Sequence, residues 1–204
     1  NSFLILSCLK STAEQQFTFE VTEIEILNDG NLFKGNKRGK IISNDGTLIK
    51  ADNFNYDKIT NILKANGNVI IEDVINQYEI FTDEIKYFKN QNIIITKGNS
   101  KAIDNKNKII TSNIFEYDRQ NNIINAKDNV IIEDEINKYT LFTDNITYKK
   151  DISEIYTNGS TKLVVESIYN IESKNVILDE KKKNCIIKVD KRYFVILSIT
   201  VRDN

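Results

Sequence analysis

Apolar and polar residues alternate with a period of two along most of the chain. Within each short segment the β-branched and aromatic side chains share one parity, and Lys, Asn, Asp or Thr fills most positions between them, although Ile70 and Ile131 break the rule. This alternation predicts β-strands with one covered face, because successive side chains of a strand point to opposite sides. The apolar residues that we expect to point to the covered face, strand by strand, are Phe54, Tyr56, Leu63, Val69, Ile71, Ile85, Tyr87, Ile94, Phe115, Tyr117, Ile124, Val130, Ile132, Ile146, Tyr148 and Ile155.

The alternation belongs to an internal repeat. The hexapeptide NVIIED occurs at 68–73 and again at 129–134, and about half of the positions in 49–88 are identical to those in 110–149 at an offset of 61. A weaker half-period of 30 or 31 residues divides this repeat into units. Periods of this size are typical of repeat architectures, in which each unit buries its apolar face against its neighbours. The units start at Ile49, Ile80, Ile110, Leu141 and Ile171.

Each unit reads as two strands joined by short turns rich in Asn, Asp and Lys, such as DRQNN and EDEINK. Such turns suit reversals between antiparallel strands. No long stretch keeps the 3.6-residue apolar spacing of a helix. The sequence therefore predicts an all-β fold made of repeated antiparallel strand pairs. Either the two halves of the strand ladder face each other across an apolar interior, or a single sheet folds over on itself.

Composition narrows the possible chemistry. The chain has no histidine and two cysteines, so a zinc site of the usual kind and a Ser–His or Cys–His nucleophile are excluded. No glycine-rich phosphate loop is present. The formal net charge of −1 gives no general electrostatic argument for nucleic acid. Carboxylates are abundant and leave a two-carboxylate hydrolase open, but most lie in turn-like contexts. We therefore predict a chain that is not an enzyme, with no catalytic residues, metal or cofactor.

The two ends differ from the repeats. The run FLILSCL followed by STA predicts that residues 1–13 are the remnant of a secretory signal, cut after Ala13. Cys8 leaves a lipoprotein signal as an alternative. We expect the main domain to cover 14–184. Residues 185–204 do not align with a sixth unit, and are interpreted as a closing strand or as the product of a shifted reading frame.

The repeated units resemble the OstA-like lipopolysaccharide-transport family, over roughly residues 17–180. The family pattern is a strand with an Ala-Asp…Tyr core, a turn, and a strand with Gly-Asn-Val. Ala51, Asp52 and Tyr56 carry the first part, and 67–69 carry the second. The third unit departs from the pattern, with Ser-Asn at 112–113 and Asp128 in place of the glycine.

The resemblance implies an open twisted β-jellyroll with an apolar groove. It implies a periplasmic carrier that shields the acyl chains of lipopolysaccharide, located in the periplasm or at the outer membrane. Lipopolysaccharide and further jellyroll modules, joined end to end through edge strands, are the implied partners, and head-to-tail self-association is a further expectation. The resemblance leaves open whether the chain is a bridge protein or part of an outer-membrane translocon.

Other interpretations remain at this point. The sixteen residues of the apolar parity are our candidates for contact with acyl chains, because burial of each methylene stabilises by about 0.8 kcal/mol. The same residues could instead fill a closed core. A structural or adhesive surface β-solenoid is the alternative function, and a β-helix enzyme acting on carbohydrate ranks below it.

Overall fold

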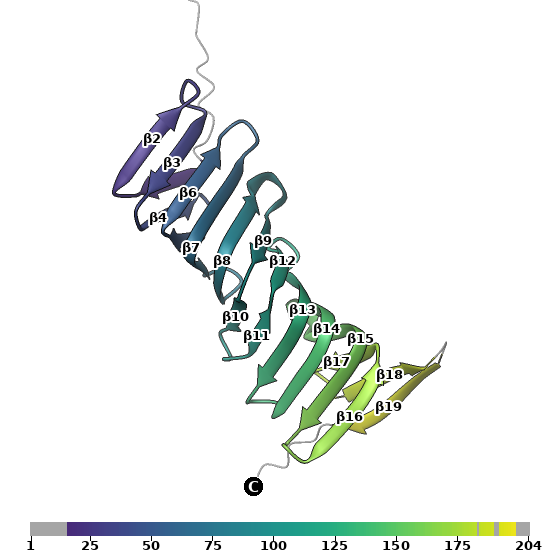
Figure 1. Cartoon of the computed structure of the whole chain (residues 1–204). Helices are drawn as coiled ribbons and strands as arrows, with labels where there is room; N and C mark the ends of the chain where they lie inside the picture. Colours follow the sequence, from purple (N-terminus) through teal and green to yellow (C-terminus); the bar gives the residue numbers. More distant parts are fainter. Residues whose placement is uncertain (1–15, 183, 190–191, 199–204) are drawn as a thin grey trace, which may run out of the picture.

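The computed structural model describes residues 16–182, 184–189 and 192–198. In this part of the chain nineteen antiparallel strands form one hydrogen-bonded sheet, and two 3-10 turns, η1 (Lys89–Gln91) and η2 (Lys150–Ile152), are the helical segments. The molecule is elongated, and successive strands stack along its length (Figure 1). The predicted all-β fold of repeated antiparallel strand pairs is confirmed, and so is a sheet that does not close into a barrel. Residues 1–13, interpreted as a signal remnant, lie outside the described part.

The sheet is folded lengthwise into two walls. Five long strands cross from one wall to the other and belong to both. They are β7 (Ile62–Asp73), β8 (Tyr78–Phe88), β13 (Ile123–Asp134), β14 (Tyr139–Lys149) and β15 (Glu154–Val165). Each of them changes register near its middle or faces a strand that does, for example between Asn66 and Val69 of β7.

The shorter strands belong to one wall each. Wall A contains β2 (Glu23–Leu27), β3 (Leu32–Asn36), β6 (Asn53–Asp57), β9 (Ile93–Lys97), β12 (Ile114–Asp118), β17 (Val176–Asp179), β18 (Asn184–Val189) and β19 (Arg192–Ser198). Wall B contains β1 (Phe17–Glu20), β4 (Gly39–Ser43), β5 (Leu48–Ala51), β10 (Ser100–Asp104), β11 (Ile109–Ser112) and β16 (Tyr169–Lys174). The strands β18 and β19 extend wall A over most of the tail that does not align with the repeat.

The walls meet along a fold line built from the Asp and Gly-Asn positions of the repeat. Gly67 and Asn68 both have positive φ, and together they face the single residue Asp83 across the β7–β8 pair. Two residues opposite one define a β-bulge, which bends a strand. The backbone N–H of Asp52 donates to the carbonyl of Gly67 over 2.9 Å, and Asp83 does the same to Gly98 over 3.1 Å. The family-like motif therefore marks the corner of the folded sheet.

Candidate functional site

The interior between the walls holds every predicted apolar residue. All sixteen candidates are buried, none of them more than 5% exposed. Their alternation predicted correctly which side chains point inward. A role for them in contacting lipid remains a prediction, because their burial fits a filled core as well as a groove that opens.

Wall B supplies a second set of interior residues, which the sequence pattern did not single out. Tyr78 and Ile80 lie on β8 with even parity, while Ile85 and Tyr87 of the same strand have odd parity, and all four are buried. The corner at the fold line causes this change of parity, because β8 passes it with two exposed residues, Asp83 and Glu84, between the buried Thr82 and Ile85. The bulge gives β7 one residue more at the corner, so β7 keeps a single inward parity from Leu63 to Ile71. The buried wall B residues that were missed include Phe17, Ile41, Ile49, Tyr78, Ile80, Ile110, Tyr139, Leu141 and Val165.

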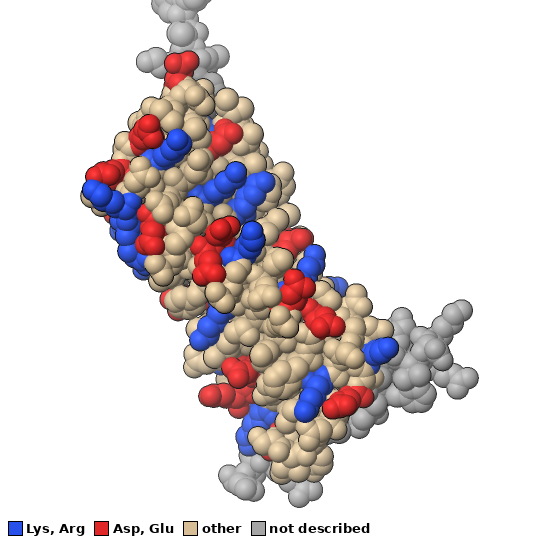
Figure 2. Space-filling model, in the orientation of Figure 1, with Lys and Arg blue, Asp and Glu red and all other residues tan. Residues whose placement is uncertain are grey.

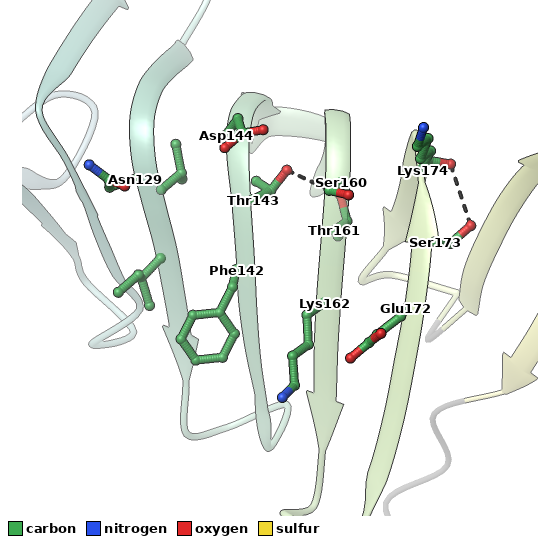
Figure 3. A pocket seen from close by; sticks show the side chains of 12 residues that line it. Asn129, Phe142, Thr143, Asp144, Ser160, Thr161, Lys162, Glu172, Ser173 and Lys174 are labelled. Atoms are coloured by element: carbon green, nitrogen blue, oxygen red, sulfur yellow. Dashed lines mark hydrogen bonds between the residues drawn. The ribbon is translucent and has the colours of Figure 1, made fainter.

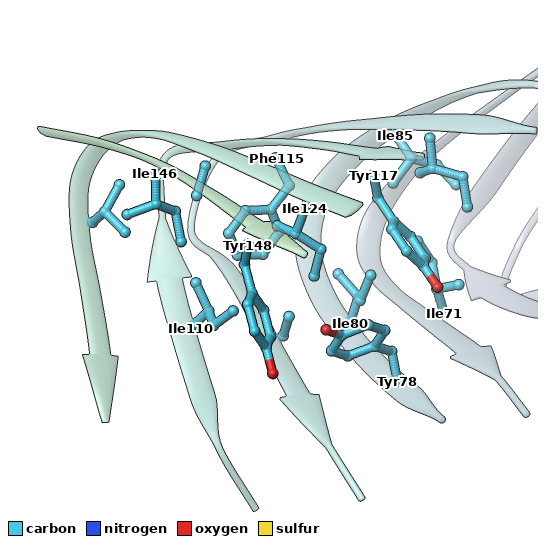
Figure 4. Packing of buried hydrophobic residues seen from close by; sticks show 14 of the residues in the cluster. Ile71, Tyr78, Ile80, Ile85, Ile110, Phe115, Tyr117, Ile124, Ile146 and Tyr148 are labelled. Carbon is cyan, nitrogen blue, oxygen red and sulfur yellow. The ribbon is translucent and has the colours of Figure 1, made fainter. Parts of the chain in front are cut away.

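Aromatic contacts join the two walls across the interior. The ring of Phe17 on wall B meets Tyr56 on wall A edge-to-face, with 4.9 Å between centroids. Tyr78 on wall B meets Tyr117 on wall A in the same way at 5.5 Å. Figure 4 shows Tyr78 and Tyr117 among isoleucines of both walls. The interior of this structure is therefore packed, and an acyl chain could enter it only if the walls separated.

Opposite the fold line, the turns at the free rims of the two walls approach each other along a seam. In the part of the chain that the structure describes, the contacts that cross the seam involve side chains, whereas the backbone bonds stay within a wall or lie at the fold line. Two polar clusters close the seam, one towards each end of the molecule.

The first cluster centres on Asp45, at the turn between β4 and β5 on wall B. Its Oδ2 accepts from Lys89 Nζ at 2.5 Å and from Arg119 Nη1 at 2.8 Å, both on wall A. Arg119 Nε donates to Asp73 Oδ2 at 2.8 Å, and the Tyr117 hydroxyl donates to the same oxygen at 2.9 Å. Burial alone would raise the pKa of Asp45, but the hydrogen bonds from Lys89 and Arg119 outweigh it and hold that pKa well below its usual range.

Tyr87 completes the first cluster. Its hydroxyl accepts from Arg119 Nη1 at 2.7 Å and donates to Asn92 Oδ1 at 3.2 Å. Burial raises the pKa of the Tyr87 phenol to about 12, so the phenol stays neutral and can donate at any physiological pH.

The second cluster centres on Lys108, at the turn between β10 and β11 on wall B. Its Nζ donates to Glu180 Oε2 on wall A at 2.6 Å and lies 3.3 Å from Asp134 Oδ2. The Tyr139 hydroxyl also donates to Glu180, at 2.6 Å. Between the clusters, Lys150 Nζ of wall A reaches the carbonyl of Asn76 on wall B at 2.6 Å and lies 4.0 Å from the centroid of the Tyr78 ring.

The sequence analysis did not predict the seam, although charged residues of the seam recur at fixed positions of the repeat. A basic residue follows two positions after the inward tyrosine of four units, and an Asp ends three wall B segments, at Asp73, Asp104 and Asp134. The basic residues are Lys58, Lys89, Arg119 and Lys150. Ion pairs form at Lys89 and Arg119, whereas the side chain of Lys58 is exposed.

Two hollows on the described part of the surface are of interest. One, of about 530 Å³, lies at the seam over Lys108, Lys150 and Tyr148, and the exposed Ile75 and Ile136 are part of its lining. The other, of about 590 Å³, lies on the outer side of wall B, where Phe142 stands beside Lys162 and Glu172 (Figure 3). Elsewhere on the face shown in Figure 2, acidic and basic side chains are interspersed, and no patch of one sign dominates it.

Among the described residues, no group of three or more cysteines and carboxylates is arranged to hold a metal ion. No helix in this part of the chain is long and apolar enough to cross a bilayer.

Comparison with known proteins gives a match in structure and none in sequence. No protein-family model matches the sequence. No curated protein matches it either. A solved structure that does match is that of LptH from Pseudomonas aeruginosa, described as the LptA-homologous periplasmic component of the conserved lipopolysaccharide transport device. The match has a TM-score of 0.50 at 16% identity and covers 56% of this chain and 84% of LptH. The chain therefore has an LptA-like fold, and the likeness reaches no further than the fold.

Proposed function

We propose that this chain is a periplasmic carrier of lipopolysaccharide that shields the acyl chains between walls A and B. The observation that carries the proposal is the construction of the interior: the sixteen predicted apolar side chains and further ones from wall B form one continuous apolar cluster along the molecule. The LptA-like fold supports this assignment, because LptH is described as a component of lipopolysaccharide transport.

The energetics favour an apolar cargo. Each methylene moved from water into the interior contributes about 0.8 kcal/mol, so a chain of a dozen carbons offers several kcal/mol towards separating the walls. The fold line would keep its backbone bonds during opening, while the seam would lose only side-chain contacts. The sugar and phosphate groups of the cargo would stay at the seam, in contact with water.

The bridge role rests on the ends of the molecule. Among the described strands, β1 and β2 form the N-terminal edges of the two walls, and β16 forms the C-terminal edge of wall B. Edge strands can add a strand of another module through backbone hydrogen bonds. We propose that jellyroll modules of a transport bridge, or further copies of this chain, add at these edges, in the periplasm or at the outer membrane.

Photo-crosslinking tests the proposal. A photoreactive side chain placed at Val69 or Val130, inward on equivalent positions of the two repeats, is expected to capture lipopolysaccharide. The same probe at Lys86 or Thr147, on the opposite parity of β8 and β14, is expected to capture little, because acyl chains gain free energy only from the apolar face. Equal capture on both faces, or none on either, would instead indicate a scaffold with a closed core.

A further inference from the structure

We infer that Lys89, Arg119 and Tyr87 form a binding site for the phosphate group of an anionic amphiphile, and that the chain's own Asp45 occupies this site while the walls are closed. This inference rests on the proposed function and specifies how the cargo's charged part is recognised.

Charge balance within the first cluster supports the inference. With Asp45 in place, the two cations Lys89 and Arg119 are matched by the two carboxylates of Asp45 and Asp73. If Asp45 leaves, Arg119 keeps its bond to Asp73 and the site carries one uncompensated positive charge. A phosphate monoester carries one to two negative charges and three acceptor oxygens, so it can replace a carboxylate held by two cations.

The donors already converge on one point. Lys89 Nζ and Arg119 Nη1 both lie within 2.8 Å of a single atom, Asp45 Oδ2. The Tyr87 hydroxyl is 3.4 Å from the same oxygen and can turn its proton towards an incoming acceptor. The site is thus shaped before any ligand arrives, and the cost of ordering long side chains on binding is small.

Asp45 is the member of the cluster best placed to move. Its side chain is 24% exposed, whereas those of Lys89, Arg119 and Asp73 are 7% exposed or less. Asp45 sits in the tight turn from Ser43 to Gly46, away from the long strands. Its Oδ1 accepts from the backbone N–H and the hydroxyl of Thr47, at 3.1 and 2.8 Å, so one oxygen stabilises the turn and the other spans the seam.

The second cluster does not share this property. Lys108, Asp134 and Glu180 are all 7% exposed or less, and the single cation faces two carboxylates. An added phosphate would meet net negative charge there. The phosphate site therefore belongs to the first cluster, at the rim of wall A beside the β4–β5 turn.

Binding measurements with the full chain test the inference. The probes are an acylated, bisphosphorylated glucosamine disaccharide, the same compound without phosphates, and inorganic phosphate alone. We expect the phosphorylated lipid to bind at least tenfold more tightly than the dephosphorylated one, and Lys89→Gln to remove about tenfold of that preference. Lys64→Gln, which removes an exposed lysine of β7, is the matched control and should leave the preference unchanged.

Asp45→Asn gives an independent test, because it removes the competing charge and keeps the side-chain shape. It should strengthen binding of the phosphorylated lipid about threefold or more. The control is Asp57→Asn, since Asp57 also caps a rim turn, through the N–H groups of Ile59 and Thr60. Circular dichroism and thermal melting would show that each variant folds.

The outcomes separate the two proposals. If both lipids bind the wild-type chain equally well, the carrier function stands and the phosphate site is overturned. If Asp45→Asn leaves binding unchanged or weakens it, the site is likewise overturned. If neither lipid binds, the carrier function fails and the inference fails with it. If inorganic phosphate alone binds as tightly as the phosphorylated lipid, the site serves free phosphate and its assignment to a lipid headgroup is wrong.

Discussion

At the scale of single residues, the Asp and Gly-Asn positions of the repeat stabilise the corner at the fold line. Asn68 Nδ2 donates to Asp52 Oδ2 at 2.8 Å, and Asn99 Nδ2 donates to Asp83 Oδ2 at 2.9 Å, one unit further along. Each carboxylate thus accepts a hydrogen bond from an Asn that has positive φ at the corner of the neighbouring strand. Positive φ is accessible to glycine and tolerated by Asn, which explains the dipeptide at this corner.

Replacing a corner glycine should therefore cost more than replacing a glycine in an open turn. A Cβ on Gly67 (φ +78°) would lie 2.6 Å from Asp52 Oδ2, whereas a Cβ on Gly30 (φ +84°) would meet nothing within 4 Å. Both alanine variants incur backbone strain of about 1–2 kcal/mol, and Gly67→Ala adds an overpacking penalty of about 1–3 kcal/mol. Chemical denaturation of both variants measures the difference. Equal losses of stability would show that the Asp52 contact does not matter.

Some residues of the site could be predicted from the sequence and others could not. The motif pointed to Asp52 and Gly67, but a linear pattern does not show that a turn and a carboxylate meet at a corner. The contacts across the seam are harder still to predict, because Asp45 and Arg119 are 74 positions apart and Asp45 precedes the first unit of the repeat. Their contact depends on the whole sheet folding over.

At the scale of elements, alternation predicted the strands of wall A well. It failed for the wall B halves of β8 and β14, because these strands pass the corner without the extra residue of a bulge, so their inward parity changes there. From the sequence alone β8 looks like an irregular strand, because its buried residues are Tyr78, Ile80, Ile85 and Tyr87. The spacing becomes regular once each half of the strand, on either side of the corner, is considered separately. A change of inward parity within one strand is therefore a signal of a bend.

The N-terminal end offers a prediction about assembly. Ile24 and Ile26 pair with the inward positions Gly35 and Phe33, yet they are 46% and 55% exposed. A second module added at β1 and β2 would cover them. We expect the weight-average mass of the wild-type chain to rise with concentration in sedimentation, and Ile26→Lys to suppress this rise, because a buried lysine without a partner is costly.

The control for this experiment is Ile59→Lys, which changes an isoleucine that is 77% exposed in a rim turn of wall A. It should associate like the wild-type chain. A mass that stays constant with concentration, or an equal effect of both substitutions, would argue against assembly through the N-terminal edges.

At the scale of the whole molecule, the two long sides of the folded sheet differ in kind. The fold line is held by backbone hydrogen bonds that recur along the molecule, such as those from Asp52 to Gly67, Asp83 to Gly98 and Asn113 to Asp128, and disrupting it would uncouple strands. The seam is held by ion pairs and phenol hydroxyls at a few places. Buried ion pairs contribute little net stability compared with a packed apolar contact, because desolvation offsets their attraction. If the walls separate, we therefore expect the seam to part and the fold line to hold.

Covalently linking the rims should block loading. With Cys8 and Cys185 replaced by serine, cysteines at Asn76 and Lys150 would lie on opposite rims, where the lysine now reaches the carbonyl of Asn76. A short cleavable bismaleimide joining them should abolish capture of lipopolysaccharide by a photoprobe at Val130, and cleavage of the linker should restore it. The control joins Asn31 and Lys58, neighbours on the rim of wall A, and should leave capture unchanged. Undiminished capture by the linked chain would mean that acyl chains enter through the ends of the molecule, between the edge strands, and that the seam stays closed throughout.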